Sequence, residues 1–102
     1  MRTSRRVVIT GLGVISPIGI GKDAFWENLI AGKSGVDCIT AFDPSAYGCR
    51  VAGEVTDFNP EDLISSRRAK IMGRFSQFAL AATRLALEDA ALSITPPLAK
   101  TT

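Results

Sequence analysis

The chain has 102 residues, of which 46% are hydrophobic and 22% charged, a composition typical of a globular protein with one modest core. Twelve basic and ten acidic residues give a net charge of +2, which is too balanced to favour nucleic acid or a membrane surface as the partner. The sequence contains no histidine, which excludes Ser-His-Asp and Cys-His catalysis within it and removes the commonest metal ligand. We expect no metal and no cofactor.

The first predicted element is a strand at residues 7–9, where three β-branched residues are typical of a strand buried on both faces of an α/β sheet. A loop follows, in which Gly11, Gly13 and Gly19 are predicted to take backbone angles closed to other residues. The stretch nearly matches a dinucleotide-binding fingerprint, but Ser16 occupies the position of the third glycine and Pro17 follows where a helix should run. A core strand is the better interpretation.

The start of the chain also imitates a twin-arginine export signal, because Arg5 and Arg6 precede an apolar run. That run is broken by Gly, Ser and Pro and has no small-residue cleavage site. Without an export signal, Cys38 and Cys49 are expected to be reduced thiols in a cytoplasmic protein, and their spacing fits no metal site. We assign them no role at this stage.

A short amphipathic helix is predicted for residues 23–31, with Asp23 in its first turn and Gly32 placed to end it. The following Gly-Lys-Ser lacks the earlier glycine and the strand that a phosphate-binding loop requires, so a structural loop is predicted. Residues 36–47 show no sustained period. A short peripheral strand is predicted within residues 49–55, around Val51 and Val55. Asn59 and Pro60 indicate the start of a helix that carries the basic residues after it.

The longest periodic segment is a predicted helix at residues 69–91, apolar on nearly every face and rich in alanine. Such a helix is typical of the inside of a layered protein. A buried strand and a buried helix together require neighbouring parallel strands and a second helix layer, which 102 residues do not contain. The basic residues of the chain concentrate just before and within this helix, and they indicate one local basic patch, formed by Arg67, Arg68, Lys70, Arg74 and Arg84.

Short motifs recur in a fixed order along the whole chain: Arg5-Arg6-Val7-Val8-Ile9-Thr10-Gly11-Leu12-Gly13, Ser16-Pro17-Ile18-Gly19, Phe25-Trp26, Gly32-Lys33-Ser34-Gly35, Phe42-Asp43, Ala52-Gly53, Phe58-Asn59 and Arg74-Phe75-Ser76-Gln77-Phe78-Ala79. In this order they resemble the opening of the elongating, type II β-ketoacyl-acyl carrier protein synthases. The resemblance implies an α/β fold, the N-terminal fragment of a thiolase-like α-β-α-β-α layered fold. Residues 1–102 would then be the N-terminal segment of a β-ketoacyl synthase domain, about its first quarter.

The resemblance further implies a decarboxylative Claisen condensation of an acyl thioester with malonyl-acyl carrier protein, in fatty acid biosynthesis. The family's catalytic cysteine and two histidines have no counterpart here, and neither Cys38 nor Cys49 corresponds to the nucleophile. We therefore expect no catalytic residue in this chain and no condensing activity from it alone. Arg67 and Lys70 lie in the stretch that, in similar synthases, contacts the acidic helix of acyl carrier protein. Arg68 departs from the family pattern there but is also positively charged. The implied partners are acyl carrier protein and, in the complete enzyme, a second copy of the synthase.

Three positions depart from the family pattern: Ile71, Gly73 and Ala91. Ala91 stands where a glycine usually ends the long helix, and it would cost about 1 kcal/mol if φ there is positive. Two further interpretations stay open. One is a small module that retains only the binding of acyl carrier protein; the other is a related polyketide ketosynthase. The alternative for the basic residues is that they only solvate the join between two helices.

Overall fold

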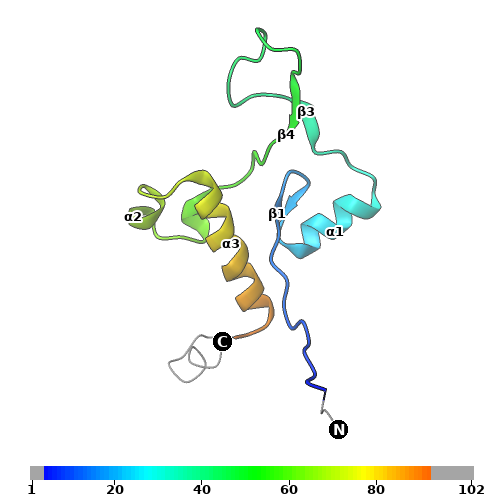
Figure 1. Ribbon diagram of the computed structural model, residues 1–102, viewed down its shortest axis with the longest axis vertical. Helices are drawn as coiled ribbons and strands as arrows, with labels where there is room; N and C mark the ends of the chain where they lie inside the picture. Colours follow the sequence, from blue (N-terminus) through cyan, green and yellow to red (C-terminus); the bar gives the residue numbers. More distant parts are fainter. Residues whose placement is uncertain (1–3, 93–102) are drawn as a thin grey trace.

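The computed structural model describes residues 4–92 as two small antiparallel hairpins and a series of helices. The first hairpin pairs β1 with β2, and the second pairs β3 with β4. In chain order the elements are β1 (Ile15–Ser16), β2 (Gly19–Ile20), α1 (Lys22–Ile30), β3 (Val36–Cys38), β4 (Val51–Gly53), the 3-10 turn η1 (Pro60–Asp62), α2 (Ser66–Ala69) and α3 (Arg74–Asp89). Figure 1 shows α3 in the middle, with α2 on one side and the β1–β2 hairpin and α1 on the other.

The predicted strand at residues 7–9 is wrong. Val7, Val8 and Ile9 form no strand and are 90%, 70% and 83% exposed. A strand of the buried type needs neighbours on both edges, and the described part of the chain supplies none for it. The first strands instead form where Pro17 and Ile18 make a two-residue turn, with Ile15 opposite Ile20.

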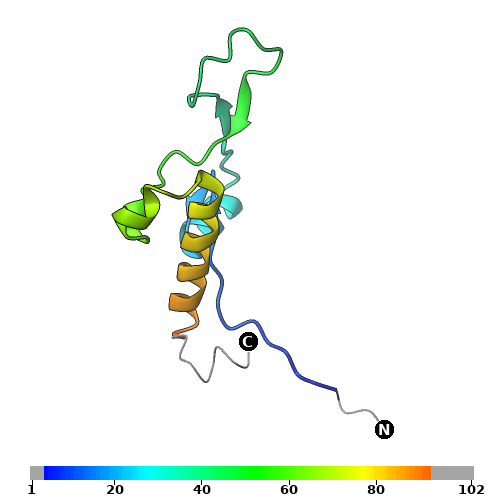
Figure 2. The same cartoon turned by 60° about the vertical axis from the view of Figure 1, so that its left-hand side comes forward.

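Gly11 and Gly13 allow the N-terminal segment to lie directly against α3, as both views of the ribbon show (Figures 1 and 2). A Cβ atom at Gly13 would overlap the carbonyl oxygen of Ala82, and one at Gly11 would overlap that of Ala86. Neither glycine has a positive φ; among the described glycines only Gly21 and Gly32 do. The loop glycines of the first motif therefore serve close packing and not unusual backbone angles.

Asp89 near the end of α3 binds both the start of α1, through an ion pair, and the same segment, through a hydrogen bond. The Lys22 ammonium pairs with the Asp89 carboxylate, which also accepts a hydrogen bond from the backbone N–H of Leu12 at 3.0 Å. The hydrogen bond from Lys22, followed by that from Leu12, holds the pKa of Asp89 below its usual range. Asp89 thus joins the last turn of α3 to the residues just before β1.

The predicted helix at residues 23–31 is confirmed as α1, and Gly32 ends it as expected. Gly32 has φ +71°, its N–H donates to the Leu29 carbonyl, and the N–H of Lys33 donates to the Asn28 carbonyl at 2.9 Å. This pattern is a Schellman motif. The Gly-Lys-Ser stretch is therefore a helix terminus, in agreement with the structural interpretation.

The helix start at Asn59 is confirmed, but the helix is shorter than predicted. The Asn59 side chain accepts a hydrogen bond from Glu61 N–H, and η1 ends at Asp62. The basic residues lie on a separate helix, α2, which has its own cap at Ser65. Likewise the long helix begins at Arg74 and not near residue 69, and the predicted stop at residues 93–97 lies outside the described residues.

The core is small. The described residues classed as buried are Phe58, Ile64, Ala69 and Ala81, and Phe58 meets Phe78 edge to face at a centroid distance of 5.2 Å. Apart from Ala81, the apolar residues of α3 are partly or fully exposed. No helix within residues 4–92 has both the length and the hydropathy needed to cross a bilayer.

Candidate functional site

The three basic residues singled out from the sequence lie together around α2. The Oγ of Ser65 caps this four-residue helix by accepting a hydrogen bond from the N–H of Arg68 at 3.4 Å. Apolar contacts fasten α2 to the protein, because Ala69 within it and Ile64 just before it are only 7% and 4% exposed. With this side buried, Arg67, Arg68 and Lys70 are all left exposed.

Arg74 does not belong to this cluster, although the sequence placed it in the basic patch. Its guanidinium lies over the rings of Phe58 and Phe78, at 5.4 and 4.9 Å from their centroids. Its Nη2 donates to the Val55 carbonyl oxygen at 2.7 Å. Arg74 therefore holds the start of α3 against the segment before η1, which is a structural role.

Arg84, which the sequence also placed in the basic patch, does lie beside this cluster. It lies one turn after Leu80 on α3, and the two residues line a hollow of about 390 Å³ together with Arg68, Ile64 and Ser65. We call the exposed cations on or next to α2, together with the one beside this hollow on α3, the basic surface: Arg67, Arg68, Lys70 and Arg84. The helical period that relates residues 80 and 84 is the sequence signal that joins Arg84 to Leu80.

Within residues 4–92, no acidic side chain forms an ion pair with the basic surface. The ion pair found within residues 4–92 is that of Lys22 and Asp89, so no carboxylate there lies within 4 Å of the four cations. An exposed group of like charges without internal partners attracts an acidic surface at a distance and contacts it at the rim of an interface. This arrangement can bind and orient an anionic partner, but it offers no nucleophile.

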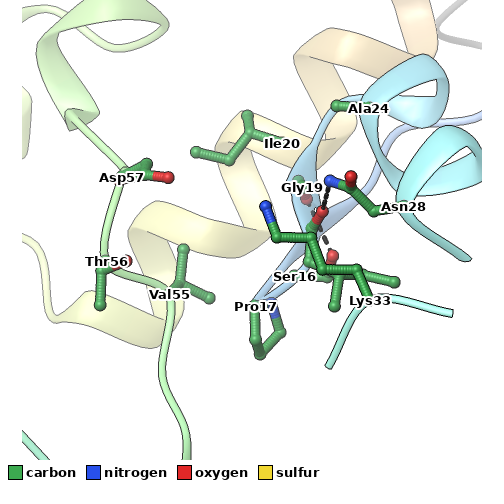
Figure 3. Close-up of a pocket in the computed structure, with 11 residues that line it drawn as sticks. Ser16, Pro17, Gly19, Ile20, Ala24, Asn28, Lys33, Val55, Thr56 and Asp57 are labelled. Carbon is green, nitrogen blue, oxygen red and sulfur yellow. Dashed lines mark hydrogen bonds between the residues drawn. The ribbon is translucent and has the colours of Figure 1, made fainter. Parts of the chain in front are cut away.

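A second hollow, of about 210 Å³, lies between the β1–β2 turn, α1 and residues 55–57 (Figure 3). Two of its five polar side chains, those of Ser16 and Asn28, bond to the backbone around them. Ser16 Oγ donates to the Gly19 carbonyl at 2.8 Å, and the Asn28 amide donates to the Ile18 carbonyl. These two bonds hold the turn against α1, and we assign no chemistry to the hollow.

No other part of the described chain forms a catalytic or metal-binding constellation. Residues 4–92 contain no group of three or more metal-ligating side chains. Cys38 and Cys49 are exposed on the β3–β4 hairpin, and neither lies at a turn from a strand into a helix. The Gly-Leu-Gly stretch packs on α3, which agrees with the rejection of a dinucleotide site.

Comparison with known proteins shows the family of this chain. The family described as Beta-ketoacyl synthase, N-terminal domain, matches residues 4–99. The chain is 46% identical over 94 residues to 3-oxoacyl-[acyl-carrier-protein] synthase 2 of Staphylococcus aureus (strain COL), and 44% identical over 90 residues to the protein of the same name from Synechocystis sp.. These matches cover 92% and 88% of this chain but only 23% and 22% of the relatives, so the chain spans less than a quarter of their length.

A solved structure agrees with these relatives. A chain of the ishigamide ketosynthase/chain length factor superposes with a TM-score of 0.82 at 46% identity, covering 89% of this chain and 23% of that one. The expected fold class, an N-terminal part of a thiolase-like α/β fold, is thereby confirmed, and so is the resemblance drawn from the sequence motifs. The chain belongs to the β-ketoacyl synthase family.

Proposed function

We propose that this chain is the N-terminal part of a 3-oxoacyl-[acyl-carrier-protein] synthase that condenses an acyl thioester with malonyl-acyl carrier protein in fatty acid biosynthesis. The names of the relatives at 44–46% identity support this proposal. Within the complete enzyme the segment contributes no reacting group, because it has no histidine and its cysteines lie on a hairpin. Its contribution to function is to dock the carrier protein.

The basic surface carries this docking role. Arg67, Arg68 and Lys70 are exposed on or next to α2, and Arg84 adds a fourth cation across the hollow. Carrier proteins of this class present an acidic helix, in keeping with the family resemblance, and four unpaired cations complement it. Because the contacts are exposed, they act mainly on the encounter rate and weaken with salt, with a Debye length of about 8 Å at physiological ionic strength.

Charge reversal in the complete synthase tests the docking role. Arg67→Glu combined with Lys70→Glu is expected to raise the KM for carrier-bound substrates about tenfold, since each exposed pair contributes up to about 1 kcal/mol and reversal adds repulsion. The KM for pantetheine or coenzyme A thioesters, which lack the acidic helix, should stay unchanged. Steady-state kinetics with both substrate types, at low and high salt, measures the difference.

Two matched variants sharpen the result. Arg84→Glu should show the same selective loss, and Arg50→Glu, an exposed cation on the distant β3–β4 hairpin, should show none. Equal losses on carrier-bound and free thioesters for the α2 variants would assign the cluster a structural role and remove the docking proposal.

The second candidate function is a module that only binds acyl carrier protein. It is supported by the position of the basic surface, all of which lies inside the described residues. Titration of the 102-residue chain with acyl carrier protein, followed by NMR of the labelled carrier, tests whether this chain binds the carrier by itself. Salt-sensitive binding without condensation fits both proposals, and the synthase proposal additionally requires activity when the chain is part of the full enzyme.

The name of the solved ketosynthase/chain length factor gives weak support to a polyketide ketosynthase. We also propose that the complete enzyme is a cytoplasmic homodimer.

A further inference from the structure

The helix on which most of the basic surface is built is too short to hold its own orientation. α2 has four residues, and two backbone hydrogen bonds close its single turn. The N–H of Ala69 donates to the Ser65 carbonyl at 2.9 Å, and the N–H of Lys70 donates to the Ser66 carbonyl at 3.2 Å. A helix of this length is not stable in water without tertiary contacts. The direction in which α2 presents its cations therefore depends on the residues that hold it.

Apolar contacts hold α2 against the protein but do not fix the rotation of the helix about its axis. Ile64 and Ala69 are buried, and Ala69 contributes a single methyl group. The burial of apolar surface has no preferred direction, whereas a hydrogen bond has a preferred distance and angle. A directional contact is therefore needed to set the rotation of α2.

Gln77 makes a directional contact of this kind. It is the fourth residue of α3, and its side-chain amide donates a hydrogen bond to the Ala69 carbonyl at 2.9 Å. This carbonyl lies at the C-terminal end of α2, where the last carbonyls of a helix have no partner inside the helix. It also accepts a bond from the N–H of Met72, at the longer distance of 3.3 Å. Within residues 4–92, the bond from Gln77 is the side-chain hydrogen bond that joins α2 to α3.

The Gln77 amide is itself held in place by α3. The backbone N–H of Gln77 donates to the Gly73 carbonyl at 3.0 Å, in the first turn of this helix. Arg74 lies three residues earlier, and its bond to the Val55 carbonyl fixes the same end of α3. The Gln77 side chain is half-buried, so water competes less strongly for its hydrogen bond. The position of α3 therefore determines where the end of α2 lies.

The basic surface is divided between the two elements that this bond joins. Arg67 and Lys70 are three residues apart, so they share a face of the α2 turn and move together when the turn rotates. Arg84 belongs to α3 and lines the hollow together with Arg68. The hydrogen bond from Gln77 thus fixes the spacing between the cations of α2 and the cation of α3.

We propose that Gln77 is a positioning residue for carrier docking, which holds the four cations at the spacing that one acidic surface can meet. The inference rests on the proposed docking function. Gln77 is uncharged and acts through the cations of α2. A preorganised surface binds more tightly, because less freedom is lost on association. Loss of the amide should therefore speed the dissociation of the carrier. Association, which the unchanged charge steers, should keep its rate and its salt dependence.

Gln77→Met in the complete synthase tests this role, because it removes the amide donor and keeps the length of the side chain. The KM for carrier-bound substrates should rise about fivefold, within the range for one neutral hydrogen bond, whereas kcat and the KM for pantetheine thioesters should stay unchanged. Binding kinetics with acyl carrier protein should assign the loss to the dissociation rate.

Asn28→Leu is the matched control. The Asn28 amide also donates to a backbone carbonyl, but it lies on α1, on the other side of α3 from α2 (Figure 1). This variant should leave the KM for carrier-bound substrates unchanged. A rise equal to that of the Gln77→Met variant would show that any lost amide bond weakens docking, and the positioning role would be wrong.

A combined variant separates positioning from a general loss of stability. In a synthase that already carries Arg67→Glu and Lys70→Glu, adding Gln77→Met should cause no further rise in the KM for carrier-bound substrates. A full additional rise, or equal losses on carrier-bound and free thioesters, would assign Gln77 a purely structural role. If the charge-reversed variant lost carrier-bound substrates selectively and Gln77→Met had no effect, the positioning role alone would be refuted. If the charge-reversed variant showed no selective loss, the docking function would be wrong, and this inference with it.

Discussion

Ala91 ends α3 in a backbone conformation that glycine adopts more easily. Its φ is +55°, its N–H donates to the Glu88 carbonyl, and the N–H of Leu92 donates to the Leu87 carbonyl at 2.9 Å. This is the Schellman pattern that Gly32 makes at the end of α1. The cost expected from the sequence, conditional on a positive φ, therefore applies here.

Ala91→Gly should stabilise the last turn of α3 by about 1 kcal/mol, because glycine has no Cβ to clash in the left-handed region. Amide hydrogen exchange measures the effect at Leu92, whose protection should rise about fivefold for that energy. The matched variant is Gly32→Ala, which should lower protection at Lys33 by a similar factor. Unchanged exchange at Leu92 would show that this helix end carries no strain.

The sequence predicts the exposure of a single side chain correctly where only its neighbours in the chain determine that exposure. Arg67, Arg68 and Lys70 are exposed as expected, because they lie on or next to the short helix α2, which buries Ala69 and not its charged residues. The sequence could not separate Arg74 from Arg84. Arg74 turns inward onto two rings that are brought together only by tertiary packing, and that packing leaves Arg84 facing the hollow.

At the scale of elements, local signals were sufficient for α1 and for the start of η1, where Gly32 and Asn59 satisfy the backbone groups at the helix ends. Strands depended on partners that the local sequence does not specify. β3 was missed because the three residues Val36–Cys38 are too few to give a sustained alternation, and the strand is defined by its pairing with β4. The expected strand at residues 7–9 failed for the same reason.

The close contact of the N-terminal segment with α3 gives a prediction for this pair of elements. Gly13→Ala should destabilise their packing by about 1–3 kcal/mol, because the new methyl group would overlap the backbone of Ala82, which cannot rotate away. Urea unfolding of the 102-residue chain, followed by circular dichroism, should show a lower midpoint.

Gly48→Ala is the matched control for this substitution. A Cβ at Gly48 would meet no atom within 4 Å, so the midpoint should stay the same or rise slightly. Equal midpoints for the Gly13→Ala and Gly48→Ala variants would contradict the assigned role of Gly13.

At the scale of the whole molecule, the described residues bury little apolar surface. The buried set is limited to two large apolar side chains and two alanines, and none of the large ones is completely buried. The radius of gyration is 17.7 Å, against about 13 Å for a compact domain of this length. The few buried residues lie where α3 meets η1 and α2, and the remaining apolar faces are open.

We therefore predict that the isolated chain is marginally stable and self-associates through residues 7–9, whose apolar side chains and unpaired backbone groups are exposed. Light scattering over a concentration series should show oligomers, and amides at residues 7–9 should exchange rapidly in dilute solution. Ile9→Lys should reduce association without loss of helix, because the side chain is 83% exposed. The control Ile30→Lys, on the exposed side of α1, should have a smaller effect, since α1 offers no unpaired strand edge. A compact monomer with strongly protected amides at residues 7–9 would show that this segment already has a partner within the chain.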